Sequence, residues 1–207
     1  MKNILYISLL FFSNLILTQD YHVAKNGDDS NPGTKDKPFL TISKAAKIAL
    51  PGSVITVHKG VYRERVDPHY GGASNTKRIV YQAAENEEVW IKGSEIIKDW
   101  EKYKGNIWMV ELNNQMFGDF NPYQEIVEGD WLINDYGRDH HLGEVYLNGN
   151  ALYENDSVHK LMEEKPMKRA TDQEASKYQW YCKSDDKRTI IYANFKGLNP
   201  NVETVEI

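Results

Sequence analysis

Residues 21–64 read YHVAKNGDDSNPGTKDKPFLTISKAAKIALPGSVITVHKGVYRE and combine strands, turns and a helix in one short unit. Glycine, asparagine, aspartate and proline dominate residues 26–33, where they supply the positive φ angles and side-chain hydrogen bonds of turns. The β-branched run at 54–57 is typical of a buried strand, and Gly60 turns the chain into a further strand at 61–64.

A short amphipathic helix is predicted between these strands. Its apolar side chains recur at i, i+3, i+4 and i+7: Ile42, Ala45, Ala46 and Ala49. Thr41 precedes them and is placed to act as the N-cap, and Pro51 with Gly52 ends the helix.

This order of elements resembles the N-terminal entry of right-handed parallel β-helix proteins of the pectate-lyase-like type. The resemblance rests on NPGT at 31–34, TI at 41–42, PG at 51–52 and GVYRE at 60–64. A β-solenoid exposes an apolar stack at its first coil, which a helix with a small-residue face can cover. Because this fold hosts lyases, hydrolases and adhesins, the resemblance assigns an architecture and not a chemistry.

The composition excludes some function classes. The 207 residues carry a formal net charge of −5 and no basic block, which argues against nucleic-acid binding. Cys182 is the only cysteine, so no intrachain disulfide can form. We interpret it as a buried apolar thiol and not as a reactive one.

The first 18 residues differ from the rest. Lys2 is followed by a mainly apolar run at 4–17, which is too short and too interrupted to span ~30 Å of hydrocarbon comfortably. We therefore predict a signal peptide at 1–18 and a secreted or periplasmic protein. An uncleaved membrane anchor is the alternative.

The spacing of the predicted strands changes after Gly93. Before it, strands at 78–84 and 89–93 continue the first unit. After it, strands are expected at 107–112, 144–149, 178–183 and 189–194, the last two joined by a hairpin turn at 184–188. One or two helical turns are expected within 158–164, and the polar run 165–177 is expected to be an exposed loop.

The predicted fold is all-β, with one short capping helix. Residues 19–93 form the cap and first coils of a right-handed parallel β-helix, 94–197 an inserted antiparallel β-sandwich-like domain, and 198–207 a strand returning to the β-helix. The alternating sequence VETVEI at 202–207 stops in mid-strand, so we expect the chain to be truncated and its edge to promote aggregation.

Sequence blocks in the second half resemble the N-terminal part of glycoside hydrolase family 120 β-xylosidases. The blocks are FGDFNPY at 117–123, GDW at 129–131, LGEVYLNG at 142–149 and IYANF at 191–195. The resemblance covers residues 21–207 and implies a retaining β-xylosidase that acts on xylo-oligosaccharides. Such an enzyme needs two carboxyl groups ~5–5.5 Å apart. In the family these lie on later coils, so no catalytic residue is expected within 1–207 and this chain alone is expected to be inactive.

The same resemblance implies substrate contacts. Trp131 of the GDW block is expected to stack on a sugar ring, with Asp130 beside it and with Asn121 and Tyr123 at the pocket rim. As alternatives, Trp131 anchors the core of the insertion, and Asn121 and Tyr123 only fold their loop. The remaining tryptophans occur in strand-like segments, where core packing is expected: Trp90, Trp100, Trp108 and Trp180.

Other polar clusters have a simpler interpretation. The run Asp139, His140 and His141 has the residue types of a metal or acid–base site. Neighbouring residues on a strand face opposite ways, however, and no partner ligands are identifiable, so a solvent-facing loop without metal is expected. Solvated carboxylates are expected at 85–88, 163–164 and 185–186. No cofactor is predicted, since no motif supports Ca²⁺.

Three functions follow from these observations. The first is a fragment of a secreted β-xylosidase whose partner is a xylo-oligosaccharide. The second is a polysaccharide lyase-type β-helix enzyme, and the third is a non-catalytic carbohydrate-binding or cell-surface module. A homo-oligomer of the full-length protein is compatible with all three.

Overall fold

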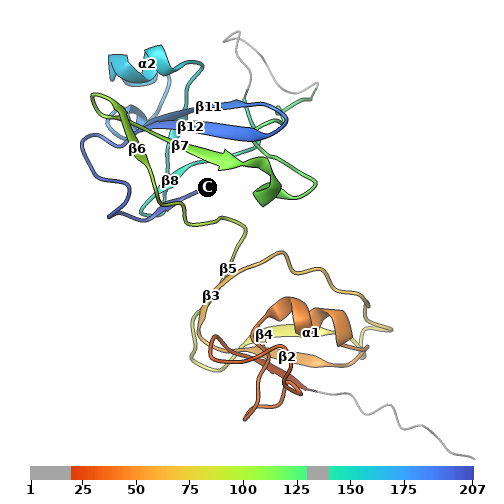
Figure 1. Cartoon of the computed structure of the whole chain (residues 1–207). Helices are drawn as coiled ribbons and strands as arrows, with labels where there is room; N and C mark the ends of the chain where they lie inside the picture. The colour runs from red at the N-terminus through yellow and green to blue at the C-terminus, as the bar shows by residue number, and fades with distance from the viewer. Residues whose placement is uncertain (1–19, 130–139) are drawn as a thin grey trace, which may run out of the picture. The chain divides into compact units, whose positions relative to one another are not determined.

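The computed structural model describes residues 20–129 and 140–207 and is mainly β, with a few short helices (Figure 1). The chain divides into two compact units, Met1–Gly93 and Ser94–Ile207. The predicted signal peptide at 1–18 lies outside the described residues. Within the described ranges, no helix is long and apolar enough to cross a membrane.

The first unit contains two parallel sheets. One has the order β1 (Tyr21–Val23), β2 (Val54–Val57), β4 (Val80–Ala83), and the other pairs β3 (Gly60–Arg63) with β5 (Val89–Lys92). Ile55 lies opposite both Tyr21 and Tyr81 in register. Because parallel strands need long crossover connections, the helix and loops between them lie outside the sheets.

Helix α1 (Ile42–Ile48) begins as predicted. The Thr41 hydroxyl accepts a hydrogen bond from the Lys44 amide at 3.1 Å, and the predicted apolar face is buried. The Glu64 carboxylate adds a second cap, because it accepts from the backbone amides of Ile42 at 3.0 Å and Ser43 at 2.7 Å. Because Glu64 directly follows β3, these two hydrogen bonds attach the start of α1 to the end of that strand.

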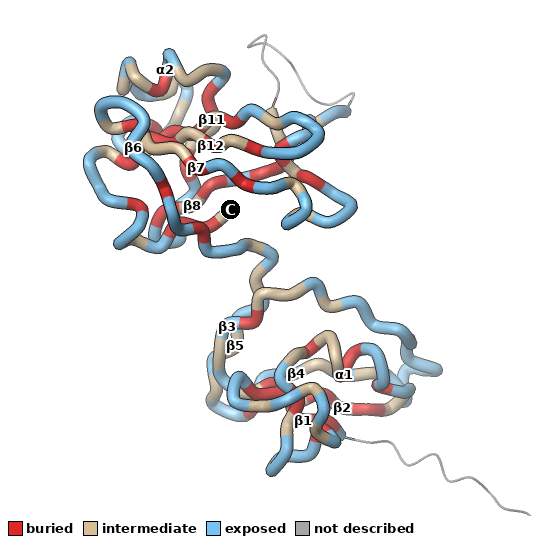
Figure 2. The backbone as a smooth tube through the Cα atoms, in the orientation of Figure 1, coloured by how far each residue is buried: buried red, intermediate tan, exposed pale blue. Residues whose placement is uncertain are grey.

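The core of the first unit lies between α1 and the strands, as Figure 2 shows by the buried residues. Phe39, Ile55 and Tyr62 are among its most deeply buried strand and loop residues. The last strands leave apolar side chains open, since Val80 on β4 and Ile91 on β5 are 39% and 55% exposed. Trp90, expected in a core, is 54% exposed on β5, so that expectation is wrong. Strand propensity does not specify which face an aromatic residue occupies.

The second unit has a larger mixed sheet of five strands. Its strands, in sheet order, are β10 (Tyr153–Glu154), β11 (Gln179–Ser184), β12 (Arg188–Asn194), β7 (Ile107–Asn113) and β6 (Glu101–Lys104). All neighbours are antiparallel except β10 and β11. The predicted hairpin is present, because β11 and β12 pair directly and lie side by side in Figure 1.

A second, three-stranded antiparallel sheet completes this unit. It has the order β13 (Val205–Glu206), β8 (Tyr146–Leu147), β9 (Asn150–Ala151). Both sheets contribute to one core, in which Leu147 and Val205 join Val110, Trp180 and Ile191. This shared core fixes the two sheets against each other.

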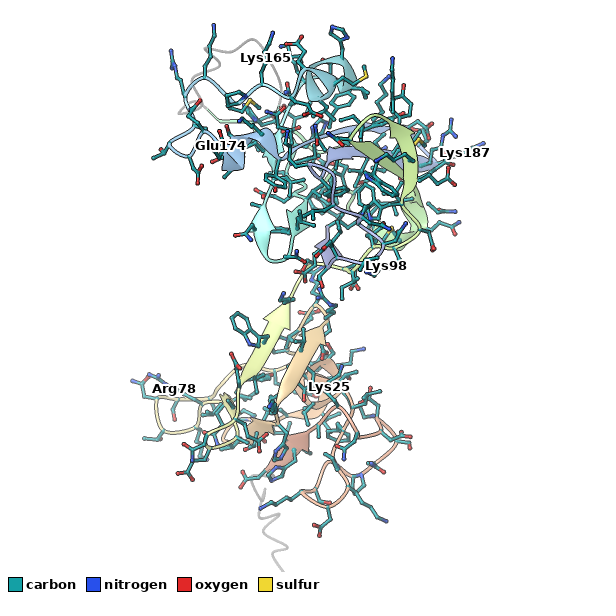
Figure 3. The ribbon with its side chains drawn as sticks, turned by 90° about the vertical axis from the view of Figure 1, so that its left-hand side faces the viewer. Lys25, Arg78, Lys98, Lys165, Glu174 and Lys187 are labelled. Carbon is teal, nitrogen blue, oxygen red and sulfur yellow. The ribbon has the colours of Figure 1, made fainter. Side chains whose placement is uncertain are left out.

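Short helices and an exposed loop lie outside the sheets. They are η1 (Asn114–Phe117), α2 (Val158–Glu163) and η2 (Ala175–Lys177). Most of the segment 165–177 is exposed, as predicted, and Figure 3 shows Lys165 and Glu174 on its outside.

The last ten residues belong to the second unit. A strand at 198–207 is predicted to return to the β-helix; in the structure, Val205 lies opposite Leu147 in an antiparallel pair. The amide of Ile207 also donates to the carbonyl of Glu95 at 3.0 Å, within the same unit. The alternating pattern indicates a strand correctly, but the strand's partner depends on residues far away in sequence.

Candidate functional site

An open hollow of about 700 Å³ lies on the second unit beside strands β10 and β11. Its lining is polar and aromatic, with Glu154, Asp156, Tyr181, Gln124 and His141 among its residues. Histidine and carboxylate groups occur together here, so this hollow is the best candidate for a binding site in the described residues.

Glu154 is the centre of the polar cluster. Its side chain is only 10% exposed, and its carboxylate lies 2.5 Å from Nδ1 of His141 and 3.4 Å from Nδ1 of His140. The same carboxylate accepts a hydrogen bond from the backbone amide of His141 at 3.2 Å. One largely covered carboxylate therefore contacts two neighbouring histidines.

Pairing of distant segments brings these groups together. The amide of Val127 donates to the carbonyl of His140 at 2.7 Å, and Ile126 forms an isolated bridge with His141. Glu154 is carried by β10, which pairs with β11. The expectation that His140 and His141 face opposite ways is wrong, because this short bridge is not a regular strand. Among the described residues, no group of three or more metal-ligating side chains has a geometry that holds a metal ion.

Asn121 and Tyr123, predicted at a pocket rim, are buried in the second unit. The Asn121 side chain donates to Oγ1 of Thr189 at 2.9 Å and accepts from the amide of Tyr123 at 3.0 Å. The Tyr123 side chain is buried, and its hydroxyl donates to the carbonyl of Glu144 at 2.6 Å. These contacts favour the alternative in which both residues fold their loop. Tyr123 also contributes to the lining of the hollow, so its predicted place at a pocket rim stays a prediction. Asp130 and Trp131 lie outside the described residues, so their predicted sugar contacts stay predictions.

Cys182 also lines the hollow, but its thiol is in an unreactive environment. It is buried, and its thiol lies 3.8 Å from the carbonyl oxygen of Tyr123. Burial, together with the negative charge of Glu154, raises the pKa of the Cys182 thiol to about 12. The thiolate is therefore scarce at neutral pH, and the interpretation as a buried apolar thiol is confirmed.

The other carboxylate clusters stabilise turns and ion pairs. Glu87 accepts from the amide of Lys59, and this contact, with His58, lowers its pKa. Glu164 pairs with Lys196 at 2.8 Å, which lowers the pKa of that carboxyl. Asp185 accepts from two amides of its own hairpin. Each of these carboxylates already has protein partners that explain its position.

Both units of the chain are similar to known proteins. Residues 97–207 match the family described as "Glycoside hydrolase 120, insertion domain", and residues 25–70 match a family described as "Protein of unknown function (DUF1565)". A solved structure described as "The complex structure of XylC with xylose" is 47% identical, with a TM-score of 0.86. The match covers 91% of this chain and 31% of that one.

A shorter match involves a protein from Bacillus subtilis (strain 168). It is "Uncharacterized protein YwoF", which is 38% identical over 78 residues, or 37% of this chain and 16% of YwoF. The chain thus spans about a third of the length of XylC and a smaller part of YwoF.

Proposed function

Because this chain belongs to glycoside hydrolase family 120, we propose that it forms the N-terminal part of a retaining β-xylosidase acting on xylo-oligosaccharides. One observation carries the proposal: 91% of the chain superposes on part of XylC, a protein solved with xylose, at 47% identity. Similarity at this level covers both units of the chain and not the insertion alone.

The architecture that we propose for the whole protein is a parallel β-helix with an inserted β domain. Parallel pairing of β1, β2 and β4 and of β3 and β5 supports stacked coils. The exposed side chains of Val80 and Ile91 support further coils that cover them. The two catalytic carboxyl groups then belong to coils beyond residue 207, at the ~5–5.5 Å separation of retaining enzymes.

Trp131 and Asp130 are proposed as sugar contacts within this chain. An indole stacked on a pyranose ring contributes on the order of 1 kcal/mol beyond area burial, so Trp131→Ala should raise KM several-fold in the full-length enzyme. A sharply lower Tm with unchanged KM would instead make Trp131 a core anchor.

We also propose that the protein is exported through a cleaved signal peptide at 1–18. The motivating pattern is Lys2 followed by a short apolar run. Intact-mass measurement of the exported protein should show that these residues are removed. Exported material that retains Met1 contradicts this proposal.

An activity assay tests the main proposal. A protein that continues past Ile207 in the source genome should hydrolyse an aryl β-xyloside, and NMR should show that the first product retains the β configuration. The 207-residue chain alone should give no turnover, because in this proposal the two catalytic carboxyl groups belong to coils beyond residue 207. Turnover by this chain contradicts the proposed location of the carboxyl groups. Activity of the longer protein on pectin with Ca²⁺, and none on xylosides, moves the assignment to the lyases.

A further inference from the structure

The imidazole of His141 has one nitrogen engaged by the protein and one that is not. Its Nδ1 lies 2.5 Å from Oε1 of Glu154, and its backbone amide donates to the same carboxylate. In the described part of the chain, the other ring nitrogen, Nε2, has no hydrogen-bond partner. The His141 side chain is 21% exposed and lines the hollow.

The carboxylate of Glu154 decides which nitrogen carries the proton. An ionised carboxylate only accepts hydrogen bonds, so the neutral imidazole of His141 carries its hydrogen on Nδ1. Its Nε2 is then an acceptor.

Three neighbouring polar groups of the hollow are already engaged. The side-chain amide of Asn155 donates to Oε1 of Gln179 at 2.8 Å, and that of Gln124 donates to the carbonyl of Asp185 at 2.7 Å. The carboxylate of Asp156 pairs with Lys160. Nε2 of His141 therefore differs from these groups as an acceptor that no described residue satisfies.

We infer that His141 accepts a hydrogen bond from a sugar hydroxyl in this hollow and that Glu154 positions its ring. The inference rests on the proposed function, which makes a neutral pyranose the ligand. A hydroxyl-rich ring matches the site, since a neutral acceptor nitrogen can accept a hydrogen bond from a sugar hydroxyl. Glu154 acts through His141 and is a positioning residue.

The test replaces His141 by asparagine. The asparagine amide nitrogen occupies nearly the place of Nδ1 and keeps a donor for Glu154, whereas no atom remains at the place of Nε2. Titration of the 207-residue chain with xylose, followed by protein NMR, should show about 3- to 10-fold weaker binding for His141→Asn, the effect of one lost hydrogen bond. The matched control is His159→Asn, because the His159 side chain is 82% exposed on α2 and outside the hollow.

Thermal unfolding and a double variant separate this contact from a structural role. His141→Asn should leave Tm within about 2 °C of the wild type, since the Glu154 contact is kept. Glu154→Ala should weaken xylose binding to a similar degree, and adding it to His141→Asn should weaken binding no further. Glu154→Gln, which keeps an acceptor oxygen, should restore most of the affinity.

The outcomes distinguish this inference from the function on which it rests. If His141→Asn binds xylose like the wild type while Trp131→Ala does not, the inference is overturned and the proposed function stands. If the wild-type chain shows no xylose-dependent shifts, the inference is overturned, whereas the proposed function is decided by the xyloside assay on the longer protein. Additive losses in the double variant overturn the positioning role of Glu154.

Discussion

The substitution Tyr123→Phe removes only the side-chain hydroxyl. It tests whether Tyr123 stabilises the fold or contacts the ligand. The ring packs edge-on against Trp180, with centroids 5.7 Å apart, and also contacts Phe117. Only the hydroxyl is lost in the variant, and with it the 2.6 Å hydrogen bond to the carbonyl of Glu144. The ring contacts stay in place.

The expected cost follows from that single bond. An intramolecular hydrogen bond contributes about 0.5–1.5 kcal/mol, and we expect about 1.5 kcal/mol here because the donating side chain is buried. With a urea m value of about 1–2 kcal/mol/M, the unfolding midpoint of the second unit should fall by about 0.7–1.5 M. Tyr103→Phe is the matched control, since the side chain of Tyr103 is half exposed on β6.

Tryptophan fluorescence during urea unfolding measures this change. Trp100 and Trp180 are buried in the second unit, so they report its unfolding. Xylose affinity should be unchanged in Tyr123→Phe. The opposite result, an unchanged midpoint with weaker xylose binding, refutes the structural role and returns Tyr123 to the pocket rim.

Two further substitutions test close packing and helix capping. Gly143→Ala should destabilise the second unit by about 1–3 kcal/mol, because the added Cβ lies 2.5 Å from a ring carbon of Tyr123. Gly93→Ala, where a Cβ meets nothing within 4 Å, is its control, and equal melting temperatures for the two variants contradict the packing argument. Glu64→Ala should destabilise the first unit by about 2 kcal/mol, because two amides at the start of α1 lose their acceptor. Hydrogen exchange of the α1 amides measures this loss, and unchanged protection counts against the cap.

Local signals in the sequence were sufficient for α1 and for most strand positions. Thr41 and the small apolar face of the helix depend only on residues a few positions apart, which is why cap and face were predictable. The β11–β12 hairpin also follows from adjacent strands and their turn. In each of these elements, the residues that carry the pattern are those that make the contacts.

Contacts between distant segments were not predictable in the same way. Glu154 follows His141 by 13 residues, and only the pairing of β10 with β11 and the bridge at Ile126 bring them together. No local pattern marks Glu154 as a partner. The partner of the last strand, and the exposed face of Trp90, also depend on the assembled sheets and not on strand propensity. Candidate site residues therefore needed the structure, whereas the types of most elements did not.

The buried thiol of Cys182 makes the stability of the second unit depend on alkaline pH. The folded pKa of this thiol is about 12, whereas an exposed cysteine ionises near about 8.5. Between these values the folded state holds a proton that the unfolded state releases. Its stabilising effect is therefore complete below about pH 8.5 and is lost progressively as the pH rises toward 12.

From pH 8 to pH 10 this one group should remove about 2 kcal/mol from the free energy of unfolding. Urea unfolding at pH 8, 9 and 10 measures the loss, with Cys182→Ala as the reference. Lysines and tyrosines that ionise over the same range are present in both proteins, so their effects cancel in the difference. The variant starts less stable because of its cavity but should lose about 2 kcal/mol less than the wild type over this range. Parallel pH profiles for the two proteins contradict this prediction. They would mean that the folded thiol ionises as readily as the unfolded one, despite its burial against Tyr123.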